Sequence, residues 1–343
     1  MGLLDKLKDK LGDKVEKTKL RATMFGPRAV GKTSILASVF SDVSKNLAAT
    51  KLYFHPVSDA SNSLHNKRLE LLHLIDEATD FTETPNTGVI NATSLPEPFD
   101  FEIGMYNRTS MIELRIQDFP GEYLESHPQE VLEYLSSSET IILAIDTPYL
   151  MEENGRYNNE KNKPSLVTDF FRTNADTIKN KLVLLVPLKC ERYFHEGRIG
   201  EVTARVKVAY ASLIEFCRTQ NIACVSAPIL TLGGVEFDRM VSTESAASSV
   251  SKLARYRFFG NPPKYEPMFC VQPFYYLLTY MANYYEWSKA QPKGFMNSMR
   301  QSLASLLKDD DVFLYEVKKL STEAKTDKFG YEIIVANSIL NIH

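Results

Sequence analysis

The sequence has little cysteine: four residues among 343, none of them in a C-x-x-C pair. The six histidines are scattered, and no carboxylate at suitable spacing completes a metal site with them. These absences exclude a disulfide-stabilised secreted domain and a zinc module, because both need clustered cysteine or histidine. We expect buried free thiols in a reducing compartment and no structural metal.

The sequence also lacks any apolar run close to the roughly 20 residues that a membrane-spanning helix needs. Its N-terminus is charged throughout, and Lys6 stands where a myristoylation signal after Gly2 requires Ser or Thr. The net charge is only −3, so nothing global indicates a nucleic-acid partner or an acidic substrate. We expect a cytoplasmic protein that does not bind nucleic acid.

Apolar runs alternate with helical patterns along most of the chain. Strands are expected at 21–26, 99–106, 110–119, 140–146, 181–187 and 222–228, and helices at 32–46, 62–80, 166–180, 202–219 and 273–290. This alternation predicts an α/β fold with a mostly parallel sheet and helices on both faces. The strands at 99–106 and 110–119 are joined by a short turn, so they should form one antiparallel edge hairpin.

Three regions are expected along the chain: an N-terminal helix over 1–20, a domain over 21–290 and a C-terminal extension over 291–343. The domain carries insertions at about 47–98 and 233–270. In the first region Leu3, Leu7, Leu11 and Val15 share one helix face. That face either packs on its own domain or docks on a partner or on the membrane surface, which would make the protein membrane-peripheral.

The segment GPRAVGKT (26–33) matches G-x-x-x-x-G-K-[ST] between an apolar strand and a helix. Its glycines allow a tight turn whose N–H groups face phosphates, beside the positive end of the following helix. Lys32 would contact the β and γ phosphates, and Thr33 would ligate Mg²⁺. The predicted phosphate-binding residues are Gly26, Arg28, Ala29, Val30, Gly31, Lys32, Thr33, Ser34 and Gly121.

Asp118-Phe119-Pro120-Gly121 stands at the end of the second hairpin strand. A carboxylate there can hold the hydration shell of Mg²⁺, and the N–H of Gly121 can contact the γ-phosphate and sense its loss. The pattern D-x-x-G is weak alone, but its position at a strand end downstream of the phosphate-binding segment strengthens it.

With LKCE (188–191) and SAP (226–228) following in order, residues 20–290 resemble a Ras-type GTPase domain. The resemblance implies a P-loop NTPase fold and a guanine site. Lys189 would stack on the base, Glu191 would accept from N1–H and N2–H₂, and the Ser226-Ala227 element would donate an N–H to O6. The runs LLVPLKCE, TLGGVEF and PKYEPMFCVQPFYYLL are similar to the double-GTPase family of bacterial conflict and defence systems, whose members are encoded in pairs.

Several positions depart from the Ras-type pattern. Leu188 and Glu191 replace the usual Asn or Thr and Asp, which leaves guanine specificity open. Arg28 replaces a common glycine and would either block an arginine finger supplied by a partner or act as an internal one. Glu122 stands at the usual position of a water-orienting glutamine, so we predict slow hydrolysis. Lys32, Arg28 and Glu122 are the candidate catalytic residues.

Two regions leave alternatives open. The Mg²⁺-ligating switch threonine is expected at Thr87, with Thr84 and Thr93 as alternatives. The insertion at 233–270 holds a basic, aromatic cluster, Lys252, Arg255, Tyr256, Arg257, Phe258, Phe259 and Lys264. We interpret it as a lid or hairpin near the base pocket rather than as a nucleic-acid or partner surface.

The sequence predicts a GTP-binding switch that hydrolyses GTP to GDP and phosphate with Mg²⁺. It would control a partner protein in a bacterial defence-type system, and a second GTPase is a candidate partner. Three alternatives stay open: an ATPase of mixed base specificity, a nucleotide-binding scaffold with little hydrolysis, and a tether acting through residues 2–20.

Overall fold

The computed structural model describes residues 18–47, 50–76, 95–106, 111–242, 252–289 and 330–340, together with 312–313, 315–317 and 319. Residues 1–17 of the expected N-terminal helix lie outside these ranges, and so do Thr84, Thr87 and Thr93. Residues 18–20 were expected to end a helix, but they begin the first strand instead, so that boundary was wrong.

The described residues form an eight-stranded sheet. Its spatial order is β10 (Glu332–Val335), β7 (Ala223–Ser226), β6 (Leu182–Leu188), β5 (Thr140–Asp146), β1 (Thr18–Phe25), β4 (Met111–Asp118), β3 (Glu97–Met105) and β2 (Leu52–Pro56). The central strands from β7 to β4 pair in parallel. The predicted mostly parallel α/β sheet is therefore confirmed.

The edges of the sheet differ from the prediction. The hairpin of β3 and β4 is antiparallel as expected, but β2 pairs outside β3 and forms that edge. At the other edge, β10 pairs antiparallel with β7. Strand β2 was missed because it is only five residues long and ends in Pro56, both of which weaken a strand pattern.

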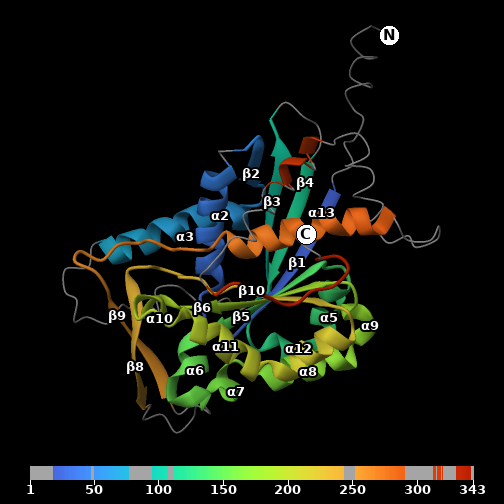
Figure 1. Ribbon diagram of the computed structural model, residues 1–343. Coiled ribbons are helices and arrows are strands. Elements are labelled where there is room, and N and C mark those ends of the chain that lie inside the picture. The colour runs from blue at the N-terminus through green and yellow to red at the C-terminus, as the bar shows by residue number, and fades with distance from the viewer. Residues whose placement is uncertain are drawn as a thin grey trace.

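Helices cover both faces of the sheet, as predicted (Figure 1). One face carries α2 (Lys32–Leu47), α3 (Asp59–Asp76) and α13 (Gln272–Lys289). The other carries α4 (Tyr123–Ser126), α5 (Pro128–Ser136), α6 (Thr147–Met151), α8 (Pro164–Thr173), α9 (Ala175–Ile178), α10 (Glu191–His195), α11 (Ile199–Ala209) and α12 (Ala211–Thr219). The two faces alternate along β5, where Ile142 packs into the first cluster and Ile141 and Leu143 into the second.

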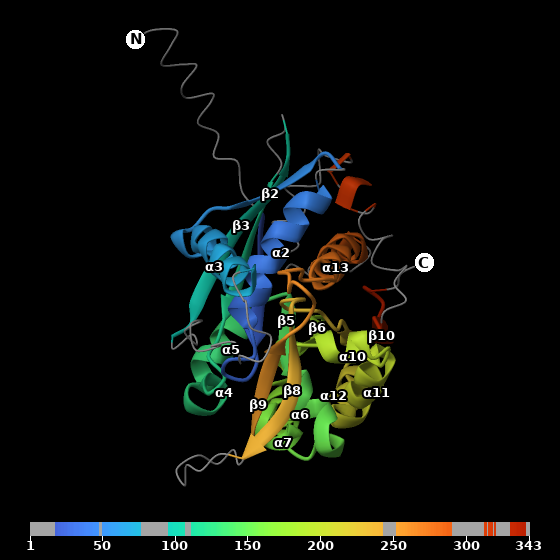
Figure 2. The ribbon, with the colours of Figure 1, turned by 90° about the vertical axis from the view of Figure 1, so that its left-hand side faces the viewer.

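Two segments outside the predicted strands and helices contain regular structure. The polar run 152–165 contains the 3₁₀ helix η2 (Glu152–Gly155), α7 (Asn158–Lys161) and the start of α8. The insertion after β7 contains a separate two-stranded antiparallel sheet, β8 (Val235–Ser242) and β9 (Lys252–Phe258). Figure 2 shows this hairpin beside α6 and α7.

The four cysteines, Cys190, Cys217, Cys224 and Cys270, are buried and free, as expected. Among the described residues, no helix combines the length and the apolar character needed to cross a membrane.

Candidate functional site

A cavity of about 300 Å³ opens at the edge of the sheet where β1, β5 and β6 end. In open α/β sheets, ligands bind in the crevice outside the carboxyl ends of parallel strands. The volume is within the range of small-molecule sites. The cavity is lined by Ala29, Val30, Gly31, Lys32, Thr33, Ser34, Asp146, Tyr149, Lys161, Lys189, Glu191, Thr231, Leu232, Val235, Leu253, Ala254 and Tyr256.

Residues 26–33, here called the glycine loop, connect β1 to α2 and form one wall of the cavity. Gly31 has φ = +106°, a conformation that residues with a Cβ rarely adopt. A Cβ on Gly26 would lie 2.7 Å from the carbonyl oxygen of Ala144, so only glycine lets the loop pass this close to β5. The Nζ of Lys32 donates to the carbonyl oxygen of Gly26 at 3.2 Å, which brings its ammonium group back to the start of the loop.

The N-terminus of α2 faces the cavity. Lys32, Thr33 and Ser34 all line it, and α2 begins at Lys32. The first N–H groups of a helix have no partner within the helix, and they carry the positive end of its dipole. This wall therefore offers an anion both backbone donors and a lysine.

Asp118 lies beside the glycine loop because β4 pairs in parallel with β1, with Asp118 opposite Met24. Its carboxylate is fully buried, and Oδ1 lies 3.8 Å from the Nζ of Lys32. Burial lowers the pKa of Lys32, while the charges of Asp118 and Glu122 raise it. The structure thus brings together the acid and the lysine that the two sequence motifs singled out.

Gly121 also touches the glycine loop. A Cβ at this position would lie 2.8 Å from the backbone nitrogen of Arg28 and 2.9 Å from the carbonyl oxygen of Gly26. Any side chain would have to displace one of the two backbones. The residue predicted to sense the γ-phosphate therefore has a position that the structure reserves for glycine.

The other two candidate catalytic residues lie outside the cavity wall. Arg28 is exposed, and its side chain is not among the lining residues. Glu122 is exposed and stands just before α4, where its side chain forms no capping hydrogen bond. The charge of Glu122 nevertheless raises the pKa of both Lys32 and Lys161, so its carboxylate lies within electrostatic range of the two ammonium groups.

The residues present fit a magnesium ion that also has phosphate and water ligands. Thr33 offers a hydroxyl at the cavity wall, and Asp118 offers a buried carboxylate beside Lys32. Mg²⁺ takes oxygen ligands and usually keeps several waters, so one or two protein ligands suffice when phosphates supply others. The described residues contain no group of three or more His, Cys, Asp or Glu placed to hold a metal alone.

Lys161 is a further ammonium group at the cavity, and no sequence motif indicated it. It ends α7, and its Nζ donates to the carbonyl oxygen of Arg28 at 3.3 Å. The Nζ also lies 5.2 Å from the ring centroid of Tyr149. Burial lowers the pKa of Lys161, the charge of Asp146 raises it, and that of Lys189 lowers it further. The residue lies in a polar run without a motif, so no local signal marks it.

Lys189, which the sequence assigned to the base, lies between the glycine loop and the β8–β9 hairpin. Its backbone is left-handed, with φ = +62°. Its Nζ donates to the carbonyl oxygen of Ala29 at 3.0 Å and to the Oδ2 of Asp146 at 2.9 Å. The same atom lies 5.0 Å from the ring centroid of Tyr256. Lys189 therefore connects the end of β5, the glycine loop and the hairpin.

Glu191 lines the cavity, but one of its oxygens is already engaged. Its Oε1 accepts from the backbone nitrogens of Leu232 at 2.7 Å and Gly233 at 3.3 Å. Burial raises the pKa of Glu191, and these backbone hydrogen bonds lower it. The carboxylate that the sequence assigned to the base thus holds the segment that leads into β8.

The structure does not bring Ser226 and Ala227 to the cavity. Both are buried, and neither lines it. The N–H of Ala227, predicted to donate to a base, donates instead to the carbonyl oxygen of Leu185 at 2.9 Å. The reason is that β7 pairs with β6 as far as Ser226, and the next N–H, that of Ala227, still bonds to β6.

The β8–β9 hairpin closes the cavity on the side away from the glycine loop, which matches our interpretation of the 233–270 insertion. Val235, Leu253, Ala254 and Tyr256 line that wall. The hydroxyl of Tyr149 donates to the carbonyl oxygen of Lys252 and accepts from the nitrogen of Ala254, both at 3.2 Å. One tyrosine of α6 thus fixes β9 against the body of the protein.

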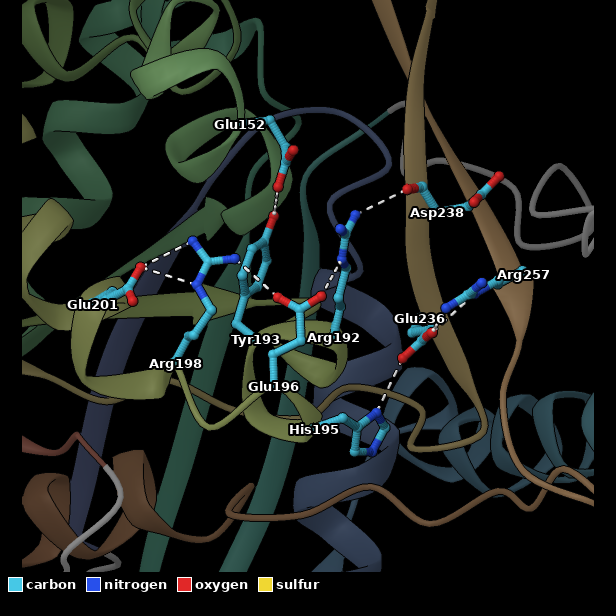
Figure 3. A network of polar contacts seen from close by, with 10 residues as sticks. All are labelled: Glu152, Arg192, Tyr193, His195, Glu196, Arg198, Glu201, Glu236, Asp238 and Arg257. Carbon is cyan, nitrogen blue, oxygen red and sulfur yellow. Dashed lines mark hydrogen bonds and ion pairs between the residues drawn. The ribbon is translucent and has the colours of Figure 1, made fainter.

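A set of polar contacts fixes the other strand of the hairpin to α10 (Figure 3). Glu236 of β8 is buried and accepts from Arg257 of β9, and its Oε2 lies 3.1 Å from the Nδ1 of His195. Arg192 donates to the carbonyl oxygen of Asp238 at 2.9 Å. Since α10 begins at Glu191, the helix that borders the cavity and the hairpin that closes it are joined.

The rest of this set joins α10 to its neighbours. The hydroxyl of Tyr193 donates to Glu152 of η2 at 2.8 Å. Arg198 donates to Glu196 and to Glu201, and Glu196 also accepts from Arg192 (Figure 3). These contacts hold α10 in place from the side opposite the hairpin.

No protein-family model and no curated protein matches this chain. Among solved structures, the chain is similar to two structures of the S. cerevisiae Ski7 GTPase-like domain, one bound to GTP and one bound to GDP and inorganic phosphate. Each has 13% sequence identity and a TM-score of 0.36. The similarity covers 66% and 65% of this chain and 45% of each of the other chains, so it spans less than half of their length.

Proposed function

We propose that the cavity binds a nucleoside triphosphate with Mg²⁺ and that the protein is a GTP-binding switch that hydrolyses GTP. The observation that supports this most is the assembly around the N-terminus of α2. Asp118 and Gly121 come from a separate part of the chain, and they meet the glycine loop and its Lys32. A helix N-terminus, a lysine and a glycine-lined turn together make an anion site suited to phosphates.

Each group has a role in the proposed reaction, GTP + H₂O → GDP + phosphate. The loop amides and Lys32 would hold the β and γ phosphates and stabilise the charge that develops during transfer. Lys161 would add a second cation near Arg28, and Gly121 would offer its N–H to the γ-phosphate. Thr33 and Asp118 would hold Mg²⁺, which would neutralise part of the negative charge of the phosphates.

The switch would operate through the segments next to this wall. Residues 118–125 approach the glycine loop at Gly121, so loss of the γ-phosphate would change their contacts. Residues 84–93 would contribute the switch threonine, with Thr87 favoured. The nucleotide state would change the affinity for a protein partner. The candidate partner is a second GTPase of a bacterial defence-type system. Residues 2–20 would dock on that partner or on a membrane surface.

A second candidate function is a nucleotide-binding scaffold with little hydrolysis. It is favoured by the exposure of Glu122 and Arg28, neither of which lines the cavity. Mixed base specificity is a further alternative, because Ser226 and Ala227 lie away from the site.

Phosphate release tests these functions. The purified chain is incubated with Mg²⁺ and either GTP or ATP, with Lys32→Ala as the inactive control. The switch predicts slow release from GTP that requires Mg²⁺ and is lost in Lys32→Ala. Binding of GTP without release above the control supports the scaffold, and faster release from ATP than from GTP contradicts the guanine assignment.

A further inference from the structure

Two buried polar atoms in the cavity wall have no hydrogen-bond partner among the described residues: Oδ1 of Asp146 and the hydroxyl of Tyr256. Polar groups buried without a partner destabilise a fold, so native proteins seldom keep them unless a ligand or water completes them. The other tyrosine of the wall, Tyr149, has its hydroxyl engaged by β9. The two atoms are therefore positioned for a hydrogen-bond partner that the described residues do not supply.

Both groups lie next to Lys189, where the sequence places the base. The Oδ2 of Asp146 binds the Nζ of Lys189, which leaves Oδ1 as the remaining acceptor of that carboxylate. The Nζ of Lys189 lies over the ring of Tyr256. The pKa of Tyr256 is raised by burial and then by the charge of Asp146, so the phenol keeps its proton and can donate. The wall thus presents an acceptor and a donor, each on a residue that contacts the Nζ of Lys189.

The hairpin that carries Tyr256 is held firmly enough to position it. Tyr149 binds β9 on both sides of Leu253, and Glu236 joins β8 and β9 to His195 of α10. A donor on a fixed element loses little conformational freedom when it binds a ligand, so its hydrogen bond contributes more to affinity and specificity.

We propose that Asp146 and Tyr256 are the residues that recognise the nucleobase, and that they select a 6-oxopurine. The Oδ1 of Asp146 would accept from N1–H, and the hydroxyl of Tyr256 would donate to the adjacent O6. Adenine has an acceptor at N1, which would face the carboxylate. This proposal rests on the proposed function, and it gives Asp146 and Tyr256 the roles that the sequence assigned to Glu191 and Ala227.

The test compares Tyr256→Phe with Tyr193→Phe by calorimetric titration in the presence of Mg²⁺. Tyr193 is the matched control because its hydroxyl binds Glu152, outside the cavity. The probes are GTP, ITP and inorganic tripolyphosphate. ITP keeps N1–H and O6 but lacks the 2-amino group, and tripolyphosphate has no base at all.

We expect Tyr256→Phe to weaken the binding of GTP and of ITP equally, by about 3- to 10-fold, which is the contribution of one hydrogen bond. The binding of tripolyphosphate should not change. Tyr193→Phe should bind all three probes as the wild type does. Asp146→Asn should weaken GTP binding more than Tyr256→Phe does, and the binding of tripolyphosphate should again not change. Wild-type GTP affinity in Tyr256→Phe would overturn the proposal.

The proposed function fails in a different way. If the wild-type chain binds neither GTP nor tripolyphosphate, the phosphate site itself is absent and both proposals are overturned. If the wild type binds GTP, and Lys32→Ala loses it while Tyr256→Phe does not weaken it, only the base assignment is overturned.

Discussion

Gly121 lies so close to Arg28 that a Cβ on it would come within 2.8 Å of the Arg28 backbone nitrogen. This contact joins the end of β4 to the glycine loop, two segments that are distant in the sequence. Only a residue without a side chain permits it. The contact gives a direct physical route by which the state of a phosphate on the loop would be transmitted to residues 118–125.

Replacement of Gly121 by alanine tests that contact. The Cβ would meet backbone on two sides, so we expect a loss of about 1–3 kcal/mol in the free energy of unfolding and weaker nucleotide binding. Gly200→Ala is the control, because Gly200 lies in α11 with no atom within 4 Å of an added Cβ. Chemical denaturation measures both variants. If Gly121→Ala is as stable as the wild type, the glycine loop can move to accommodate the Cβ, and the contact does not require glycine.

Lys161→Met should weaken GTP binding about tenfold and GDP binding less. The reason is that a charge-assisted hydrogen bond to the terminal phosphate would be lost while the apolar stem is kept. The control is Lys179→Met, which removes a surface lysine paired with Asp176 and should have no effect. Equal losses for GTP and GDP would place Lys161 away from the γ-phosphate.

Glu191→Gln separates the two roles of that side chain. The amide oxygen can still accept from Leu232 and Gly233, so the ratio of GTP to ATP affinity should stay within about twofold of the wild type. Glu191→Ala leaves these buried donors without a partner and should lower the free energy of unfolding by about 1–3 kcal/mol. Competition binding measures the ratio. If Glu191→Gln prefers ATP to GTP, Glu191 itself recognises the base.

Glu139 predicts a pH dependence of stability. Burial raises the pKa of its carboxyl to about 7, against the opposing backbone hydrogen bond from Arg21 and the charge of Lys181. An acid with a raised folded-state pKa contributes stability at low pH and loses it as the pH rises towards 7. Relative to the wild type, Glu139→Gln should gain stability between about pH 4.5 and 7, by at most about 1.4 kcal/mol per pH unit. Urea denaturation across this range checks the slope, and a pH-independent difference contradicts it.

The parts of the site that the sequence predicted depend on short-range constraints. The glycine loop needs only a strand, a tight turn and a helix in succession. Gly26 and Gly31 indicate the turn, and Lys32 indicates the start of the helix. The position of Asp118 follows from the parallel pairing of β4 with β1, which the alternation of strands and helices already implies.

At the other wall of the cavity, the sequence predicted a lid or hairpin but not which of its residues line the cavity, because that depends on long-range packing. Tyr256 reaches the site only because β9 pairs with β8 and the hairpin is fixed by Tyr149. Lys161 arrives on a one-turn helix within a polar run. The role assigned to Ala227 depends on where pairing of β7 with β6 ends, and strand register is not visible in a short apolar run.

The most direct test of the central claim is a titration of GTP, GDP and ATP with Mg²⁺ into the wild-type chain and Lys32→Ala. We predict that GTP and GDP bind the wild type more tightly than ATP does. Lys32→Ala should lose this binding while its melting temperature without nucleotide stays close to that of the wild type. If the folded Lys32→Ala variant binds GTP as tightly as the wild type, the glycine loop does not hold the phosphates and the proposed function is contradicted.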